Sequence, residues 1–132
     1  MTIQEALVAH LTGDGDVSQL VHGRVYPDVL PQKPGYPSIV YHTISSPREH
    51  SQQGPSGLAF TRIQIDCIDG TAKGARELGL AVRLALDGFA GTMGGGGGVA
   101  VGSVFVEDED GDYDDTLRLF RWRLDVVISH EE

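Results

Sequence analysis

Residues 58–89, LAFTRIQIDCIDGTAKGARELGLAVRLALDGF, contain a strand pattern followed directly by a helix pattern. From Leu58 to Ile68, apolar side chains alternate with polar ones. The apolar side carries Ile63, Ile65 and Cys67, and the polar side carries Arg62, Gln64 and Asp66. A period of two is typical of a strand with one face against the core and one toward solvent. The alternation therefore predicts a strand with one dry face.

The same stretch then predicts the strongest helix of the chain, from Thr71 to about Phe89. Apolar side chains recur there at helical spacing and form one stripe toward the core. This stripe comprises Ala75, Leu78, Val82, Ala85, Leu86 and Phe89. Leu80 and Leu84 project from the opposite face among charged residues, so we expect that either another part of the chain or a partner covers them.

The flanking sequence predicts two more helices and three more strands. The N-terminal helix has Thr2 as its cap and Glu5 as the capping-box partner, and it ends at Gly13. A second, short helix has Asp16 as its cap and ends at Gly23. The further strands are expected over residues 38–46, 99–106 and 117–128. The predicted order is α, short α, β, β, α, β, β.

This order predicts a single α+β domain over residues 1–132. Two β-hairpins and one long helix suggest a mostly antiparallel, four-stranded sheet with the helices packed on one face, as a two-layer sandwich. A length of 132 residues lies within the usual size of one domain. Segments 47–57 and 91–98 are expected to be mobile loops, because neither has enough apolar surface to offset the entropy of ordering.

The composition limits the classes of function. The formal net charge of -9 argues against affinity for nucleic-acid phosphates or anionic membrane surfaces, because the field of the protein would repel both. No apolar run has the character of a signal peptide or a membrane span. The single cysteine, Cys67, cannot form an internal disulfide, so we expect an intracellular folding environment.

Residues 107–115, EDEDGDYDD, are strongly acidic and raise the question of a metal site. Alternating aspartates supply the hard oxygen ligands that calcium requires. Counted from Asp108, however, the glycine comes too early for an EF-hand loop, and Leu119 stands where a bidentate glutamate is needed. Because Asp-Gly favours hairpin turns, we expect a solvated β-turn whose charges discourage edge association. The alternative is a calcium-stabilised binding module that uses this acidic hairpin.

The remaining motifs do not predict a catalytic site. The glycine run 94–98 has no following lysine and opens a strand, so it is expected to connect a helix to a strand rather than to bind phosphate. The five histidines lack the spacing of a preformed zinc site. Cys67 lies on the apolar side of its strand and is expected to be a buried thiol. We therefore expect no enzyme, no catalytic residue, no metal and no cofactor; a small hydrolase built around Cys67 or His42 is a more distant alternative.

Five segments, taken in order, resemble one known family. They are GRVYPDVLPQ (23–32), YPSIVYHTIS (36–45), GPSGLAFTRIQIDC (54–67), ARELGLAVRLALDGFAG (75–91) and DYDDTLRLFRWRLDVVISHEE (112–132). Together they resemble the tail completion or tail terminator (head-tail joining) family of long-tailed bacteriophages and related prophages. The resemblance covers about the whole chain. The run Gly94 to Gly98 departs from the family, whose members usually have a tighter connector there.

The resemblance implies a structural, non-enzymatic role in the virion. It implies that subunits close into a homo-oligomeric ring, usually a hexamer, which caps the finished tail tube and offers a surface to the head connector. The implied partners are other copies of the chain, the tail tube protein and the head-tail connector proteins. The protein would be made in the bacterial host cytoplasm and act at the head-tail interface. DNA would pass through the bore without specific binding, which fits the negative charge, and no membrane contact is implied.

A ring needs two unlike patches on each subunit, because cyclic assembly uses heterologous contacts. The first candidate patch is the helix face that carries Leu80 and Leu84. The second is the sheet face that carries Arg62, Arg121 and Arg123. The alternative for these arginines is a solvated sheet face on which they pair with Asp66 and Asp125.

Overall fold

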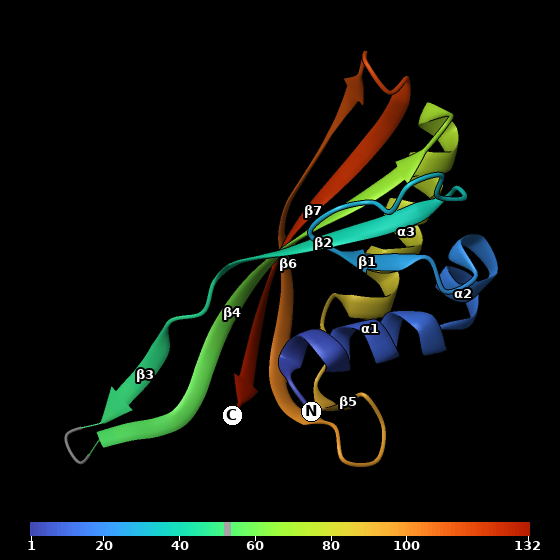
Figure 1. The fold of residues 1–132 in the computed structure, drawn as a ribbon. Helices are drawn as coiled ribbons and strands as arrows, with labels where there is room; N and C mark the ends of the chain where they lie inside the picture. The colour runs from blue at the N-terminus through green and yellow to red at the C-terminus, as the bar shows by residue number, and fades with distance from the viewer. Residues whose placement is uncertain (52–53) are drawn as a thin grey trace.

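The computed structural model of the chain describes residues 1–51 and 54–132 (Figure 1). The helices in these residues are α1 (Ile3–Gly13), α2 (Gly15–Val21) and α3 (Ala72–Leu86). The strands are β1 (Val25–Pro27), β2 (Ser38–Ser45), β3 (Arg48–Ser51), β4 (Gly54–Asp69), β5 (Gly91–Met93), β6 (Val99–Asp114) and β7 (Leu119–Glu131). Within the described residues, no helix combines the length and the apolar content that crossing a membrane requires.

Side chains that cap the backbone set the starts of the helices. At α1 the Glu5 amide donates to the Thr2 hydroxyl over 3.1 Å, and the Thr2 amide donates to the Glu5 carboxylate over 3.0 Å, which confirms the predicted capping box. At α3 the Thr71 hydroxyl accepts a hydrogen bond from an amide of the first turn. The second helix begins earlier than predicted, because Asp14 caps it in place of Asp16.

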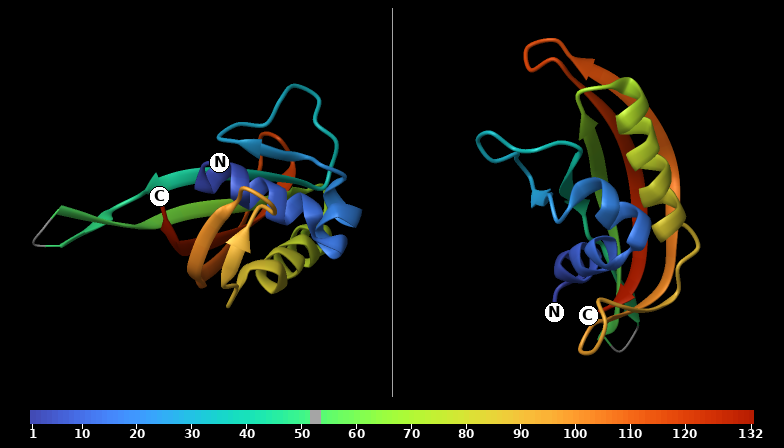
Figure 2. Two further views of the ribbon diagram at one scale, coloured as in Figure 1. Left: turned by 90° about the horizontal axis from the view of Figure 1, so that it is seen from below. Right: turned by 90° about the vertical axis from the view of Figure 1, so that its right-hand side faces the viewer.

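The strands form one mixed sheet. Its order is β1-β2-β4-β7-β6-β5, and β3 pairs with β4 off this path. β1 and β2 run parallel, whereas the other neighbours run antiparallel. Figure 2 shows that the sheet curls into a half-barrel. The two longest strands, β4 and β6, have 16 residues each, and long twisted strands coil rather than lie flat.

The expected mostly antiparallel, four-stranded sheet in a two-layer sandwich is therefore wrong. The four predicted strands correspond to β2, β4, β6 and β7, but β1, β3 and β5 extend the sheet. β1 and β5 have only 3 residues each, which is too short to show an alternating pattern. β1 also contains Pro27, a residue that argues against a strand in a sequence. β1 forms because it pairs with β2, which is distant in the chain, and β5 forms because it pairs with β6 beyond a glycine turn.

The main core lies between the helices and one face of the sheet, which we call the inner face. The helices contribute Leu7, Leu11, Val17, Val21, Leu78, Val82 and Leu86. β4 and β7 contribute Ile63, Ile65, Cys67, Leu124, Val126 and Ile128. The predicted alternation of β4 and the predicted stripe of α3 are thus both directed at this core. The opposite face of the sheet, the outer face, holds a smaller cluster of Val40, Ile68 and Leu119 beside Leu30.

The two segments that are expected to be mobile contain regular structure, and their mobility stays a prediction. In segment 47–57, β3 pairs with the start of β4, and residues 52–53 lie outside the described residues. In segment 91–98, β5 is followed by a turn in which the Gly98 amide donates to the Gly95 carbonyl over 2.9 Å. Gly94, Gly95 and Gly97 have positive φ, which glycine adopts readily. The glycine run therefore closes a β5–β6 hairpin.

Candidate subunit interface

α3 places Leu80 and Leu84 on the side that faces away from the sheet. Leu78 and Val82 are both 0% exposed against the inner face. Because successive helix residues are rotated by about 100°, a residue two positions further along points to nearly the opposite side. Leu80 is 47% exposed and Leu84 is 71% exposed. The described part of the chain therefore does not cover these two leucines, which leaves a partner as the expectation.

Charged side chains surround the two leucines. The α3 outer face, as we call it, comprises Lys73, Arg76, Glu77, Leu80, Arg83 and Leu84. Lys73 pairs with Glu77 over 3.6 Å, and Arg83 pairs with Glu109 of β6 over 3.5 Å. Arg76 donates only to the carbonyl of the preceding turn and has no carboxylate partner among the described residues. The α3 outer face thus combines exposed leucines with a guanidinium group that is available for a partner.

Trp122 of β7 connects this helix to the β6–β7 hairpin. Its indole nitrogen donates to Glu109 over 3.1 Å, and Glu109 also pairs with Arg83. A hollow of about 410 Å³ beside Trp122 is lined by small and aromatic residues such as Ala75, Tyr113 and Phe120, with charged residues at its edge that include Arg76. The ring centroids of Tyr113 and Phe120 are 4.7 Å apart. The surface that contains Leu80 therefore continues into an aromatic hollow.

The structure places Arg62, Arg121 and Arg123 on the outer face of the sheet, with Arg62 further along the strands from the other two. The register pairs Arg62 with Val127, Asp66 with Arg123, and Asp112 with Arg121, and directly paired residues share a face. Each arginine is ion-paired within the chain. Arg62 contacts Asp125 over 2.6 Å and Glu107 over 2.9 Å. Arg121 contacts Asp112 over 2.8 Å, and Arg123 contacts Asp66, Asp110 and Asp112 over 3.3 to 3.4 Å.

These pairs shift the protonation of their members. The hydrogen bond from Arg121 holds the pKa of Asp112 below its usual range, and the same bond raises the pKa of Arg121. The hydrogen bond from Arg62 to Asp125, followed by the bond to Glu107, raises the pKa of Arg62. Charged partners at hydrogen-bond distance favour the charged form of each group. The arginines therefore neutralise part of the acidic stretch, and their role in a subunit contact stays a prediction.

The acidic stretch lies in a strand, so the predicted turn at its glycine is wrong. β6 continues to Asp114, and the turn of the β6–β7 hairpin lies at residues 115–118. Asp110 and Asp112 are directly opposite Arg123 and Arg121 of β7. Within the described residues, no group of three or more His, Cys, Asp or Glu side chains is placed to hold a metal ion. The positive charges beside these aspartates therefore come from Arg121 and Arg123 of the neighbouring strand.

Sequence reasoning missed a set of apolar side chains on the outer face. Ile44 is 55%, Phe60 39% and Phe105 59% exposed. Phe105 is paired with Val127, which is paired with Arg62, and Phe60 lies two residues from Arg62 on the same strand. Ile44 contributes to a shallow hollow with Arg62 and Asp125. We call Ile44, Phe60, Phe105 and Val127 the outer patch. The sequence contains one signal of it, because Phe60 occupies a position that the alternation assigns to the polar side of β4.

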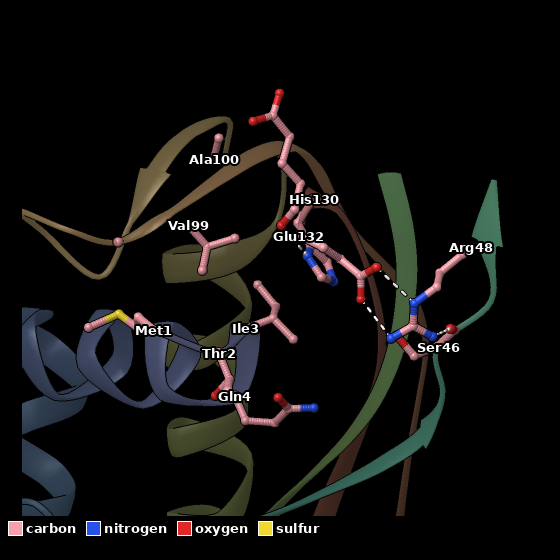
Figure 3. Close-up of a pocket in the computed structure, with 12 residues that line it drawn as sticks. Met1, Thr2, Ile3, Gln4, Ser46, Arg48, Val99, Ala100, His130 and Glu132 are labelled. Atoms are coloured by element: carbon pink, nitrogen blue, oxygen red, sulfur yellow. Dashed lines mark hydrogen bonds and ion pairs between the residues drawn. The ribbon is translucent and has the colours of Figure 1, made fainter. Parts of the chain in front are cut away.

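A cleft of about 590 Å³ lies between the start of α1, the start of β6 and the C-terminal residues (Figure 3). Arg48 reaches Glu132 across one wall, with Nε to Oε2 at 2.8 Å and Nη2 to Oε1 at 2.6 Å. Ile3 and Val99 provide apolar lining. The two-pronged ion pair ties the beginning of β3 to the C-terminal end of the chain.

Three side chains form a hydrogen-bonded chain beside this cleft. The Thr61 hydroxyl lies 2.7 Å from Ser46 Oγ and 2.7 Å from His130 Nε2, and His130 Nδ1 lies 3.0 Å from the Glu131 carbonyl. Because a carbonyl only accepts, Nδ1 donates; in the neutral ring Nε2 accepts from Thr61, which in turn accepts from Ser46. Thr61 is 0% exposed, so its hydroxyl does not face the cleft. This arrangement joins β4 to β7 and to the end of β2.

Cys67 and His42, either of which is the centre of the more distant hydrolase alternative, lie on opposite faces of the sheet. Cys67 lies on the inner face and is 0% exposed, and burial raises the pKa of its thiol. His42 is paired with Gln64, whose alternation places it on the outer face, and it lies 3.5 Å from Asp66 and Asp28. A site built around one of these two side chains would therefore not include the other.

The whole fold recurs in a solved chain of a gene transfer agent particle. A solved chain from the "Virion of native gene transfer agent (GTA) particle" matches with a TM-score of 0.73 and 18% sequence identity, over 98% of this chain and 95% of that chain. At this identity the likeness establishes the fold alone. A comparison with curated proteins finds no match.

The sequence itself matches a family profile over nearly its whole length. The profile of "Tail completion protein gp17" matches residues 5–131. This match confirms the resemblance that the five sequence segments indicate. The chain belongs to the tail completion protein gp17 family and is a structural tail protein of the virion.

Proposed function

We propose that the protein completes the tail by closing into a homo-oligomeric ring, with six copies as the expected number, which caps the tail tube and joins it to the head connector. Family membership supports the role in tail completion. The observation that best supports a ring is the α3 outer face, where Leu84 is 71% exposed on a helix whose other side is fully packed. Apolar side chains that are exposed on a helix face cost free energy in water, and contact with a neighbouring copy would remove that cost.

The proposed partners are other copies of the chain, the tail tube protein and the head-tail connector proteins. Binding and assembly, rather than catalysis, would be the activity. Arg62, Arg121 and Arg123 lie on the side of the sheet away from the helices, where they would contact a neighbouring copy while keeping their ion pairs. The formal net charge of -9 supports a bore through which DNA slides without binding, because like charges repel the phosphates.

The substitution Leu84→Glu tests the ring. A carboxylate at this position would lie in the dry contact, so the variant is expected to fold normally but to remain monomeric at concentrations at which the parent forms rings. Val29→Glu is the matched control, because Val29 is 73% exposed and lies in a loop away from α3. Multi-angle light scattering gives the mass of each protein, and electron microscopy of complemented particles gives the fraction with joined heads and tails. Rings and joined particles at parental levels with Leu84→Glu would contradict the role of α3.

A further inference from the structure

We infer that the outer patch of one copy receives the α3 outer face of the next copy. The inference rests on the proposed ring and names its two surfaces. The occupant of the outer patch is thus a second copy of this chain, which presents Leu80 and Leu84 to Phe105, Val127 and their neighbours.

The two surfaces lie on opposite sides of the subunit. α3 packs on the inner face through Leu78 and Val82, and its outer face points away from the sheet. Phe105 lies on the outer face, because it is paired through Val127 with Arg62. A heterologous contact joins two different surfaces of the same protein, and repetition around an axis closes it into a ring. Surfaces on opposite sides of a subunit allow each copy to contact two neighbours.

The outer patch has the apolar content that such a contact needs. Phe105 of β6 is directly opposite Val127 of β7, and Phe60 of β4, which is paired with Ser129, lies diagonally from Val127 on the same face. Ile44 adds to it beside Arg62. These apolar side chains lie on the same side of each strand as its charged residues. A sheet face that contacts only water carries polar groups at such positions. Exposed leucines on one side and exposed phenylalanines on the other are suited to bury each other.

Charge favours the contact between unlike surfaces. Asp108 lies directly opposite Asp125 in the register, and among the described residues it has no cationic partner. Its neighbours on the outer face include Glu107 and Asp110, which the arginines neutralise only in part. Arg76 on the α3 outer face has no carboxylate partner in the described residues. An unpaired carboxylate on one surface and an unpaired guanidinium on the other are complementary across an interface.

The same charges disfavour contacts between like surfaces. Two α3 outer faces would bring the Arg76 guanidinium groups of both copies together, and these have no carboxylate partner among the described residues. Two outer patches would bring together the carboxylates that lie beside them, Asp108 among them, and each copy already has a formal net charge of -9. Like charges at close range oppose association. A closed ring of identical contacts therefore uses one surface of each kind.

The first experiment places a carboxylate in the outer patch. Phe105→Glu is expected to fold normally and to remain monomeric at a concentration at which the parent and Val29→Glu form rings, with thermal melting as the check on folding. Equimolar Phe105→Glu and Leu84→Glu should then form a dimer by light scattering, because one intact surface of each kind remains in the mixture. Neither variant should gain mass when it is incubated alone.

The second experiment reverses the proposed charge pair. Arg76→Asp and Asp108→Arg should each lower the fraction of protein in rings at least tenfold, and the two changes in one chain should restore it to within threefold of the parent.

Ring formation by Phe105→Glu and Asp108→Arg at the parental level would overturn the assignment of the outer patch, while a defect in Leu84→Glu alone would still support the proposed ring. A parent that forms no ring in solution or on particles would overturn the proposed function and this inference together.

Discussion

Gly79 of α3 lies directly against the indole ring of Trp122 of β7, and a Cβ atom at this glycine would overlap the ring. On β6, a Cβ at Gly111 would lie 2.8 Å from Cε3 of the same ring. The two glycines therefore form a slot that holds Trp122, while its nitrogen donates to Glu109 over 3.1 Å. This slot fixes the position of α3, and with it the exposed leucines, relative to the β6–β7 hairpin.

The variant Gly79→Ala is expected to lower the free energy of unfolding by about 1 to 3 kcal/mol, because overpacking forces the indole or the helix to move. Gly13→Ala is the matched control, since Gly13 ends α1 and a Cβ there meets nothing within 4 Å. The control should be neutral or stabilising by up to about 1 kcal/mol, as alanine favours helix. Urea unfolding followed by circular dichroism measures both. Equal effects of the two substitutions would argue against a tight slot.

Leu78→Ala tests the core that α3 forms with the sheet. Leu78 is 0% exposed, and its truncation is expected to cost about 2 to 5 kcal/mol through lost burial and the cavity that remains. Leu84→Ala removes the same atoms from a side chain that is 71% exposed, and it should change the stability of the monomer by less than about 0.5 kcal/mol. Chemical denaturation at a concentration at which the protein is monomeric measures both values. A near-neutral Leu78→Ala would show that this side of α3 is not the core.

The sequence predicts elements whose periodic pattern is long enough to be seen, and α3 and β4 are examples. The stripe through Leu78 and Val82 and the alternation through Ile63 and Ile65 both reach the core. The edge strands β1 and β5 lack such a signal, because three residues show no period and their backbone pairs with strands fixed by the rest of the fold. The number of strands and the curl of the sheet therefore depend on tertiary pairing, which explains why the four-stranded sandwich is wrong.

The two arginines of β7 should differ in their effects on stability. Arg123 pairs with Asp66, whose side chain is only 9% exposed, whereas Arg121 pairs with Asp112, whose side chain is 41% exposed. Arg123→Met leaves a buried carboxylate without its guanidinium partner and is expected to cost about 1 to 3 kcal/mol. Arg121→Met should cost at most about 1 kcal/mol, because solvent replaces the lost partner. Thermal melting of both variants checks this order, and a larger loss with Arg121→Met would contradict it.

Calcium is expected to leave the protein unchanged, because cross-strand arginines already occupy the carboxylates of Asp110 and Asp112. A calorimetric titration with millimolar calcium should give no binding heat, and the melting temperature should not rise. The double variant with asparagine at Asp110 and Asp112 serves as the control for nonspecific effects. Heat that is present in the parent and absent in this variant would support a calcium-stabilised module instead.

The acidic stretch shows what the sequence could have revealed about the candidate interface. Asp108, Asp110 and Asp112 alternate with a period of two, and Arg121 and Arg123 repeat that period in the next strand. These matched periods are as consistent with a ladder of ion pairs between two strands as they are with a turn. The Asp-Gly pair nevertheless favours a turn locally, and only the register of β6 against β7 decides between them. The exposure of Leu80 and Leu84 follows from helical periodicity. In the outer patch only Phe60 has such a signal, and its grouping with Phe105 and Val127 depends on the register of the strands.

The glycine run provides the last prediction, since two of its glycines are placed differently. A Cβ at Gly98 would overlap the carbonyl oxygen of Met93 and lie 2.8 Å from that of Gly95, and both oxygens belong to the backbone of the β5–β6 hairpin. Gly98→Ala is therefore expected to cost about 1 to 3 kcal/mol, because the hairpin backbone must shift. Gly96 is the matched control: a Cβ there meets nothing within 4 Å, so Gly96→Ala should be neutral or stabilising by up to about 1 kcal/mol. Urea unfolding gives the two free energies, and limited proteolysis gives the rate of cleavage within 91–98. If Gly98→Ala matches Gly96→Ala in both measurements, the run is a loose connector in solution and the tight turn does not contribute to stability.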